Sequence, residues 1–396
     1  MYKWPPHMPD LGDVVKQYID VGNPLSISGD SGIYKELEEK FAELHGRKYA
    51  VLCSSGTLAL FSAYFALDLQ EEDEIICTAV SFHATASPAL FFKAKIIFCD
   101  VEPDTGNIDV SKIEKLITKR TRAIVTNDQW GHPCDKKRIV ELCKKAGLKY
   151  IEDCSHAHFA KYEDKFVGSF GDIACWSFQG SKILNGGEGG ILLTNDFSLY
   201  ERAVLFGHYS WRSINTTRTE KYLPINATGF GLKFRMHPLA AVIILHELEN
   251  YVHQWIESRT ATLNYFEKQL LDYTPLLPMA KKNYVKSMGA WYGFYPRLDF
   301  EAFNIDKKDF ANYLRKYDLE VKLPVNGILP YLPIFRLRFN ERELEYTPIT
   351  KRFSSAEYYL NSIIGFPTFS NHEKTEIDQY IKHIANYFEG KIKRLG

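Results

Sequence analysis

The sequence predicts an α/β fold in which a mostly parallel sheet carries helices on both faces. Short apolar runs alternate with stretches of helical periodicity over the first half of the chain, which is the pattern of repeated strand–helix units. The expected strands of this seven-stranded sheet are residues 49–53, 74–78, 95–99, 123–126, 150–153, 173–178 and 189–194. The last follows its predecessor too closely for a helical crossover, so we expect it to run antiparallel to that strand.

The pattern changes near residue 250. A long helical stretch over 249–273 leads into a region of mixed character, and a final helix is expected over 373–388. With 396 residues the chain is long enough to form two lobes. We therefore expect a large domain over residues 1–250, which includes an N-terminal arm, and a smaller C-terminal α+β domain over residues 251–396.

The composition has no excess charge. Lysine plus arginine and aspartate plus glutamate both number 49, so we expect neither nucleic acid nor a membrane as a partner. Seven cysteines without framework spacing are typical of reduced thiols in the cytoplasm. Residues 1–7 lack an apolar core of signal-peptide length, and the apolar run 240–245 is too short to span a bilayer. A cytoplasmic protein is expected.

Lys182 ends a largely apolar run and is followed by the glycine-rich segment 185–190. An amine at the end of a strand, next to a glycine-rich backbone that leaves space around it, suits the formation of an imine with a carbonyl compound. Lysines are most often solvent residues, so an exposed charge is the alternative interpretation. Three further segments bear on this choice.

The first segment is a strand, a turn of small residues and an apolar helix, with Ser55, Gly56 and Thr57 at the helix start. A helix N-terminus presents unpaired N–H groups and the positive end of the helix dipole, which favours an anion such as phosphate. The alternative is an ordinary helix cap formed by serine or threonine.

The second segment is a strand that ends at Asp153 and is followed by His156 and His158. Ligands bind at the carboxyl ends of strands in open α/β sheets. A carboxylate there can keep a pyridine nitrogen protonated, which lets the ring accept electrons. The alternatives are a helix cap for Asp153, and a polar contact or a metal pair with His158 for His156. No zinc motif accompanies the two histidines, and we predict no metal site.

The third segment, residues 78–85, is a strand that ends in a turn. Phe82 in this turn can lie flat against a planar cofactor, or it can belong to the core or the pocket wall. Ser177 stands five residues before Lys182 at the end of another predicted strand. Each segment alone is a weak signal, whereas their order along the chain is specific.

This order, together with segments 37–46, 100–109, 167–172 and 187–190, resembles the fold-type I pyridoxal-phosphate enzymes, and specifically the DegT/StrS family of sugar aminotransferases, over nearly the whole chain. The resemblance implies a pyridoxal 5′-phosphate cofactor and a ping-pong aminotransferase reaction. The donor would be L-glutamate or L-glutamine. The acceptor would be a nucleotide-linked keto sugar, a cyclitol ketone or a phosphorylated ketone. Many members carry glutamine where this chain has His156. This histidine, together with segments 177–179 and 3–5, most resembles the secondary-metabolite subgroup that acts on cyclic ketones such as inososes.

The resemblance also implies residue roles. Lys182 would form the internal aldimine and then move protons between the substrate and the cofactor, while Asp153 would pair with the pyridine nitrogen. Phe82 would stack on the ring, and His156 would lie near its phenolic oxygen. The residues at the cofactor phosphate would be Ser55, Gly56, Thr57 and Ser177.

One position departs from the family pattern. Lys233 stands where the family usually has an asparagine that reaches the cofactor phosphate of the neighbouring subunit. A lysine can serve a phosphate as a point charge, so the role can survive the change. The alternatives are a second phosphate, on the substrate, and a solvated lysine. The family pattern implies a homodimer with shared active sites.

Two other functions remain open. One branch of the family dehydrates keto sugars, but histidine replaces the lysine there, so Lys182 argues against a lyase. A non-catalytic regulator that binds the cofactor is expected to have lost the lysine or Asp153. Trp130, Trp211 and Trp291 are candidates for a wall that binds carbohydrate, with core packing as the alternative.

Overall fold

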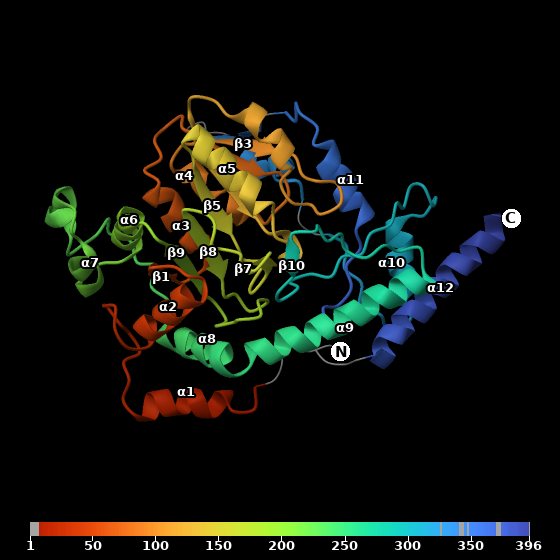
Figure 1. The fold of residues 1–396 in the computed structure, drawn as a ribbon, viewed down its shortest axis with the longest axis horizontal. Helices are drawn as coiled ribbons and strands as arrows, with labels where there is room; N and C mark the ends of the chain where they lie inside the picture. The colour runs from red at the N-terminus through yellow and green to blue at the C-terminus, as the bar shows by residue number, and fades with distance from the viewer. Residues whose placement is uncertain (1–7, 325–326, 340–343, 347, 370–373, 396) are drawn as a thin grey trace.

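A computed structural model describes residues 8–324, 327–339, 344–346, 348–369 and 374–395 (Figure 1). The expectation about a signal peptide rests on residues 1–7, which lie outside the described residues. The main sheet has the strand order β1-β9-β8-β5-β4-β2-β3. Its strands are β1 (Tyr49–Cys53), β2 (Glu74–Thr78), β3 (Lys95–Cys99), β4 (Thr121–Asn127), β5 (Lys149–Asp153), β8 (Ile173–Ser177) and β9 (Gly190–Thr194).

The sheet confirms the predicted topology. All neighbouring strands are parallel except that β9 runs antiparallel to both β1 and β8. The bounds of β1, β2 and β3 are those expected from the apolar runs, and β4 begins two residues earlier than expected. Because strand side chains alternate between the two faces, each strand contributes to two separate cores.

Helices cover both faces of the sheet. On one face, α3 (Gly56–Ala66) and α6 (Phe197–Gly207) pack against the core that contains Ile151. On the other face lie α2 (Gly32–Leu44), α5 (Lys136–Ala146) and α8 (Pro238–Asn250), and the core beside α5 contains Tyr150. The alternation along β5 therefore directs Asp153 to the α3 side and Glu152 to the α5 side.

Polar caps define where the helices of this domain begin. Ser55 accepts a hydrogen bond from an N–H of the first turn of α3, and Asp135 and Asp196 do the same for α5 and α6. Such caps satisfy N–H groups that have no partner inside the helix. Gly147 ends α5 in the left-handed conformation with φ 66°, which glycine adopts without steric cost.

The helix expected over 249–273 is two helices. α8 ends at Asn250, and α9 (Val252–Tyr273) begins after Tyr251, which has φ −126° and ψ −38°. Figure 1 shows α9 extending from beneath the sheet to the far end of the molecule, where it contacts α12 (Lys374–Leu395). With α10 (Lys307–Arg315) and α11 (Ser354–Ser362), these helices surround a second hydrophobic core.

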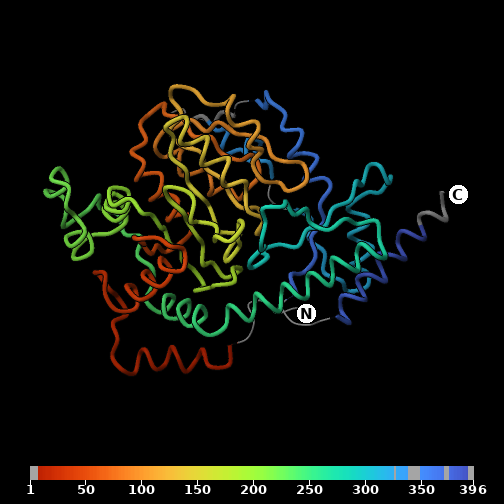
Figure 2. The backbone as a smooth tube through the Cα atoms, in the orientation of Figure 1, coloured from red at the N-terminus to blue at the C-terminus, as the bar shows by residue number. Residues whose placement is uncertain are grey.

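The second core consists mostly of residues after 262, and it lies beside the sheet domain in Figure 2. The chain returns to the sheet domain at Ile328, which pairs with Val80, and at Leu329, which joins the core under α3. The domain boundary near residue 250 stays a prediction.

The remaining elements are short or peripheral. Helix α1 lies against α8 (Figure 1). The other elements are α1 (Leu11–Asp20), α4 (Pro88–Phe91), α7 (Trp211–Thr216), β6 (Lys161–Tyr162), β7 (Lys165–Phe166), β10 (Val285–Ser287), β11 (Leu337–Phe339) and β12 (Leu344–Tyr346). All seven cysteines are buried and unpaired. Among the described residues, no helix combines the length and the apolar composition that crossing a bilayer requires.

Candidate active site

A cavity of about 490 Å³ opens beside the carboxyl ends of β4, β5 and β8, against the start of α3. This is where open α/β sheets bind ligands. The cavity brings together eight of the nine residues predicted from the sequence, and Lys233 is the exception. The predicted residues that line it are Ser55, Gly56, Thr57, Phe82, Asp153, His156, Ser177 and Lys182.

Lys182 enters the cavity from the loop between β8 and β9. Its N–H donates to the Gln179 carbonyl at 2.7 Å, and its side chain is buried with 6% of the residue exposed. Burial lowers the pKa of the Lys182 amine, and the nearby Tyr292 and Asp153 oppose this effect in part. The alternative interpretation of Lys182 as an exposed charge is therefore wrong.

The lysine loop is held against α8 by close contacts. A Cβ on Gly186 would lie 2.8 Å from Ile244 Cδ1, and one on Gly189 would lie 2.7 Å from Met236 Cε. The N–H of Asn185 donates to Glu247 Oε2 at 2.6 Å. These contacts leave room only for glycine at the two positions, and they explain the glycine-rich sequence that follows Lys182.

The start of α3 packs directly on the strands that carry the lysine loop. A Cβ on Gly56 would lie 2.6 Å from Ser177 Cβ, and one on Gly190 would lie 2.4 Å from the Ser55 carbonyl carbon. Ser55 Oγ caps α3 by accepting from the Leu58 N–H at 3.2 Å. The first N–H groups of α3, which have no partner within the helix, therefore lie at the cavity wall and fit a phosphate.

Both carboxylate oxygens of Asp153 accept hydrogen bonds. Thr85 Oγ1 donates to Oδ2 at 2.7 Å, and the Ser155 N–H donates to Oδ1 at 3.1 Å. Thr85 is itself fixed, because its hydroxyl is 2.6 Å from Ser81 Oγ and its carbonyl accepts from Tyr64 Oη at 2.7 Å. Sequence reasoning missed Thr85, since its partner is 68 residues away.

Aromatic rings form one wall of the cavity. Tyr292 stacks on His156 with centroids 4.2 Å apart, His156 stacks on Trp130 at 5.3 Å, and Trp130 stacks on Tyr295 at 4.1 Å. Burial holds the pKa of His156 well below its usual value, and Lys182 and His158 add to this effect, so the imidazole is neutral near pH 7. Tyr292, from the aromatic run 291–295, is a second residue that sequence reasoning missed.

Two buried polar atoms at the cavity lack hydrogen-bond partners among the described residues. They are His156 Nδ1 and Oδ1 of Asn127, which is 2% exposed at the end of β4. Orphaned buried polar atoms are uncommon and often mark a site for a polar ligand. Together with the start of α3 and the carboxylate of Asp153, they fit a ligand that carries a phosphate and a polar aromatic ring.

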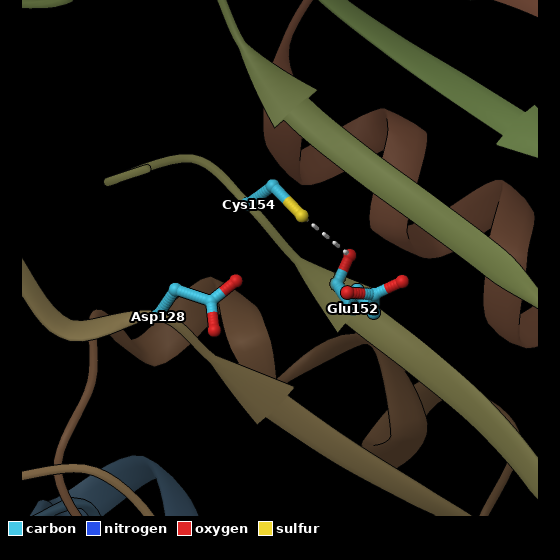
Figure 3. Close-up of side chains that lie close together, drawn as sticks. All are labelled: Asp128, Glu152 and Cys154. Carbon is cyan, nitrogen blue, oxygen red and sulfur yellow. Dashed lines mark hydrogen bonds between the residues drawn. The ribbon is translucent and has the colours of Figure 1, made fainter. Parts of the chain in front are cut away.

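Behind this wall, on the α5 side of the sheet, lie Asp128, Glu152 and Cys154, whose side chains approach one another (Figure 3). The cation beside the two carboxylates is Lys136, whose Nζ is 2.6 Å from Asp128 Oδ1 and 3.0 Å from Glu152 Oε2. Burial alone would lower the pKa of Lys136, but the carboxylates outweigh it and hold this pKa well above its usual value. The ammonium group joins the ends of β4 and β5.

The remaining candidate residues are placed differently. Lys233 is exposed and does not line the cavity of its own chain, and its expected role at the cavity of a neighbouring subunit stays a prediction. Trp130 and Trp291 are buried in the second core, and Trp211, 64% exposed, lies beside a different hollow. None of the three tryptophans lines the cavity of this chain, and the burial of Trp130 and Trp291 in the second core confirms the core-packing alternative for these two. Phe82 does line it, with 48% of the residue exposed.

A profile of the DegT/DnrJ/EryC1/StrS aminotransferase family matches residues 26–385, which cover the sheet, the cavity and most of the second core. The chain belongs to this family. The family assignment confirms the resemblance read from the sequence, together with the fold class, the enzyme class and the pyridoxal phosphate dependence that come with it.

Similar proteins act on sugars and cyclitols according to their names. The chain is 37% identical over 246 residues to the GDP-perosamine synthase of Escherichia coli O157:H7, a match that covers 62% of this chain and 65% of that protein. It is 30% identical over 302 residues to a candidate L-glutamine:3-amino-2,3-dideoxy-scyllo-inosose aminotransferase of Micromonospora echinospora, covering 76% and 70% of the two chains. The crystal structure of an aminotransferase from Psychrobacter cryohalolentis superposes with a TM-score of 0.85 at 26% identity, over 98% and 99% of the chains.

Proposed function

We propose that the protein is a pyridoxal-phosphate-dependent aminotransferase that moves an amino group from L-glutamate or L-glutamine to the keto group of a sugar. The observation that carries this proposal is a single cavity in which the buried amine of Lys182, the carboxylate of Asp153 and the start of α3 meet. A solvated lysine or an isolated helix cap would not place these three groups on one cavity.

The residues that line the cavity would each hold a different part of the cofactor. Lys182 would carry it covalently, Asp153 would face its ring nitrogen, and Phe82 and His156 would flank its ring. Its phosphate would be bound by Ser55, Gly56, Thr57 and Ser177. Pyridoxal phosphate supplies an electron-accepting ring that stabilises charge on the substrate α-carbon.

The chain's own residues have distinct tasks in this reaction. Thr85 and the Ser155 N–H fix both oxygens of Asp153, so the carboxylate presents one orientation to the cavity. Burial lowers the pKa of Lys182, which increases the fraction of neutral amine that can accept a proton. Tyr292 and His156 line the cavity as stacked rings, and Trp130 packs behind His156 outside the cavity.

The acceptor is proposed from the relatives. The name of the Escherichia coli relative specifies a GDP-linked sugar, and that of the Micromonospora relative specifies a cyclitol and glutamine. Because the higher identity is to the former, a nucleotide-linked keto sugar is the first acceptor to test, followed by cyclitol and phosphorylated ketones. His156 alone does not distinguish these classes, since its ring is stacked between Tyr292 and Trp130.

The decisive experiment follows the visible absorption of purified protein loaded with pyridoxal phosphate, before and after addition of L-glutamate or L-glutamine without acceptor. We expect the band of lysine-bound cofactor to be replaced by that of the aminated cofactor with one of the donors. Borohydride reduction and peptide mapping should place the cofactor on Lys182, and Lys182→Ala should lose the band. A cofactor that attaches elsewhere, or an active Lys182→Ala variant, would refute the proposal.

We also propose a homodimer in which Lys233 serves the cavity of the partner subunit. Support comes from the exposure of Lys233 and from its absence at the cavity of its own chain, while the neighbouring Arg235 is engaged within its own chain by donating to the Ile27 carbonyl at 2.8 Å.

Subunit mixing tests this directly. Lys182→Ala and Lys233→Ala should each be impaired alone, whereas a mixed dimer should regain one intact cavity and therefore activity. No recovery in dimers whose exchange is verified by mass spectrometry, or an active monomer in light scattering, would contradict a shared site.

A further inference from the structure

Tyr292 lies directly against the amine of Lys182. The lysine Nζ is 3.5 Å from the centroid of the tyrosine ring, so the amine contacts the face of the ring. The phenol oxygen lies 3.2 Å from Ser181 Oγ, and it also interacts with the Lys182 side chain, so that lysine lowers the pKa of Tyr292. The opposite side of the ring system is occupied by His156, which stacks on Tyr292 with an interplanar angle of 21°. The ring is thus fixed by neighbours other than the lysine.

The backbone around Tyr292 is constrained so that this ring reaches the cavity. Trp291 adopts φ 48°, a left-handed conformation that is rare for bulky residues, and its side chain is buried. Gly293 passes so close to the stack that a Cβ would lie 2.5 Å from Tyr295 Cε2 and 2.6 Å from Trp130 Cε3. Strain of this kind costs about 1–3 kcal/mol and persists where the surroundings enforce it, commonly at functional sites.

The charges around the amine are few. Tyr292 and the Asp153 carboxylate raise the pKa of Lys182. The charge of Lys182 in turn lowers the pKa values of His156 and His158, and Glu188 lines the same cavity. No described carboxylate oxygen forms an ion pair with Lys182 within 4.0 Å. The face of an aromatic ring attracts a cation by about 0.5–2 kcal/mol, which is less than a buried carboxylate would supply.

We propose that Tyr292 is a catalytic residue whose ring face holds the amine of Lys182 whenever that amine is not bound to the cofactor. The inference rests on the proposed function, in which the lysine is released by the amino donor and must return at the end of the reaction. A carboxylate at this position would trap the amine as an ammonium ion. A ring face keeps the amine within the cavity and raises its pKa less than a carboxylate would, so a larger fraction of the amine stays neutral.

The test compares Tyr292→Phe, which retains the ring face, with Tyr292→Leu, which fills similar space without one. In cofactor-free protein, reductive methylation of Lys182 with formaldehyde and cyanoborohydride is followed by peptide mass spectrometry from pH 6 to 10. We expect the midpoint of labelling to move about half to one pH unit lower in Tyr292→Leu, which loses both the ring face and the phenol oxygen, and to move less in Tyr292→Phe, which loses only the oxygen. Tyr284→Leu, whose ring stacks on Tyr162 away from the cavity, is the matched control.

Loaded protein provides the second measurement. Stopped-flow absorption after addition of the amino donor should show a decrease of about tenfold in the single-turnover rate for Tyr292→Leu and less than twofold for Tyr292→Phe. Equal midpoints in wild type and Tyr292→Leu would refute the role of the ring, and equal shifts in both variants would assign the effect to the phenol oxygen instead. If wild-type protein does not attach the cofactor at Lys182, the proposed function fails, and this is seen independently by peptide mapping.

Discussion

Thr85 Oγ1 donates a hydrogen bond of 2.7 Å to Oδ2 of Asp153, joining the turn after β2 to the end of β5. The Ser155 N–H occupies the other carboxylate oxygen at 3.1 Å. The two hydrogen bonds fix the orientation of the carboxylate before a ligand arrives. Thr85 thereby extends the site to a residue that no local sequence pattern reveals.

Thr85→Val should weaken cofactor binding and slow the first half-reaction. The substitution keeps the shape of the side chain and removes the hydroxyl from a charged acceptor, a hydrogen bond whose loss costs about 1.5–3 kcal/mol, or roughly tenfold to 100-fold in rate. Titration of apoprotein with pyridoxal phosphate and single-turnover absorption measure the two effects. Thr121 is a buried threonine at the start of β4, away from the cavity, so Thr121→Val should leave both values near those of wild type. Similar losses in the two variants would contradict a specific role for Thr85.

Gly56→Ala should disturb the phosphate end of the cavity. The added methyl group would lie 2.6 Å from Ser177 Cβ and 3.0 Å from its Cα, so backbone must move at the start of α3 or at the end of β8. Overpacking of this kind costs about 1–3 kcal/mol, and we expect cofactor affinity to fall at least about tenfold. Fluorescence titration of apoprotein measures the affinity. Gly12→Ala, which has no atom within 4 Å of the added group, should bind the cofactor like wild type.

The sequence predicted the sheet well because its strands are apolar on both faces, and such runs stand out between polar turns. The start of α3 and the strand end at Asp153 were likewise visible as local patterns. The break at Tyr251 was not, because no proline or glycine marks it and helix-forming residues continue on both sides.

Thr85, Asn127 and Tyr292 escaped prediction for a different reason. Asn127 and Tyr292 line the cavity, and Thr85 reaches it only through its hydrogen bond to Asp153. All three depend on contacts between segments far apart in the chain, and none of these residue types has a local pattern that distinguishes a cavity from a core or a surface. Trp130 and Trp291 are the converse case, because both were candidates from the sequence and neither lines the cavity. They belong to the second core, where Trp130 stacks on His156.

Glu247 should make stability depend on pH. This residue of α8 is fully buried, and its Oε1 has no partner among the described residues. Burial raises the pKa of Glu247 to about 8, and the Asn185 N–H opposes this only in part. The folded state therefore retains a proton that the unfolded state has lost, so the free energy of unfolding falls by about 1.4 kcal/mol per pH unit between the ordinary carboxyl pKa and about 8.

Glu247→Gln removes this titration. We expect the variant to gain stability relative to wild type as the pH rises from 5 to 8, measured by urea unfolding at several pH values. Glu249→Gln is the control, because Glu249 is an exposed partner of Lys40. A stability difference between wild type and Glu247→Gln that is constant over this range would contradict a protonated Glu247.

Lys136 should be among the most important residues for stability although it is far from the solvent. Its fully buried ammonium lies between Asp128 and Glu152 and also donates to Tyr150 Oη at 3.3 Å. Lys136→Met would leave two buried carboxylates without this cation, a loss of about 3–5 kcal/mol in the free energy of unfolding. Glu152 retains Arg47 at 3.7 Å, so the uncompensated charge would fall mainly on Asp128.

The neighbouring Lys137 provides the comparison, since it is exposed and pairs with Glu163 at 2.6 Å on the surface. Lys137→Met should cost no more than about 1 kcal/mol. Adding Asp128→Asn to Lys136→Met should recover part of the lost stability, because the amide removes the unpaired charge. Urea unfolding of wild type and the three variants measures these differences. Equal losses in the free energy of unfolding for Lys136→Met and Lys137→Met would mean that the buried ion pairs do not hold β4 and β5 together. The position of Asp153 would then depend on its own hydrogen bonds alone.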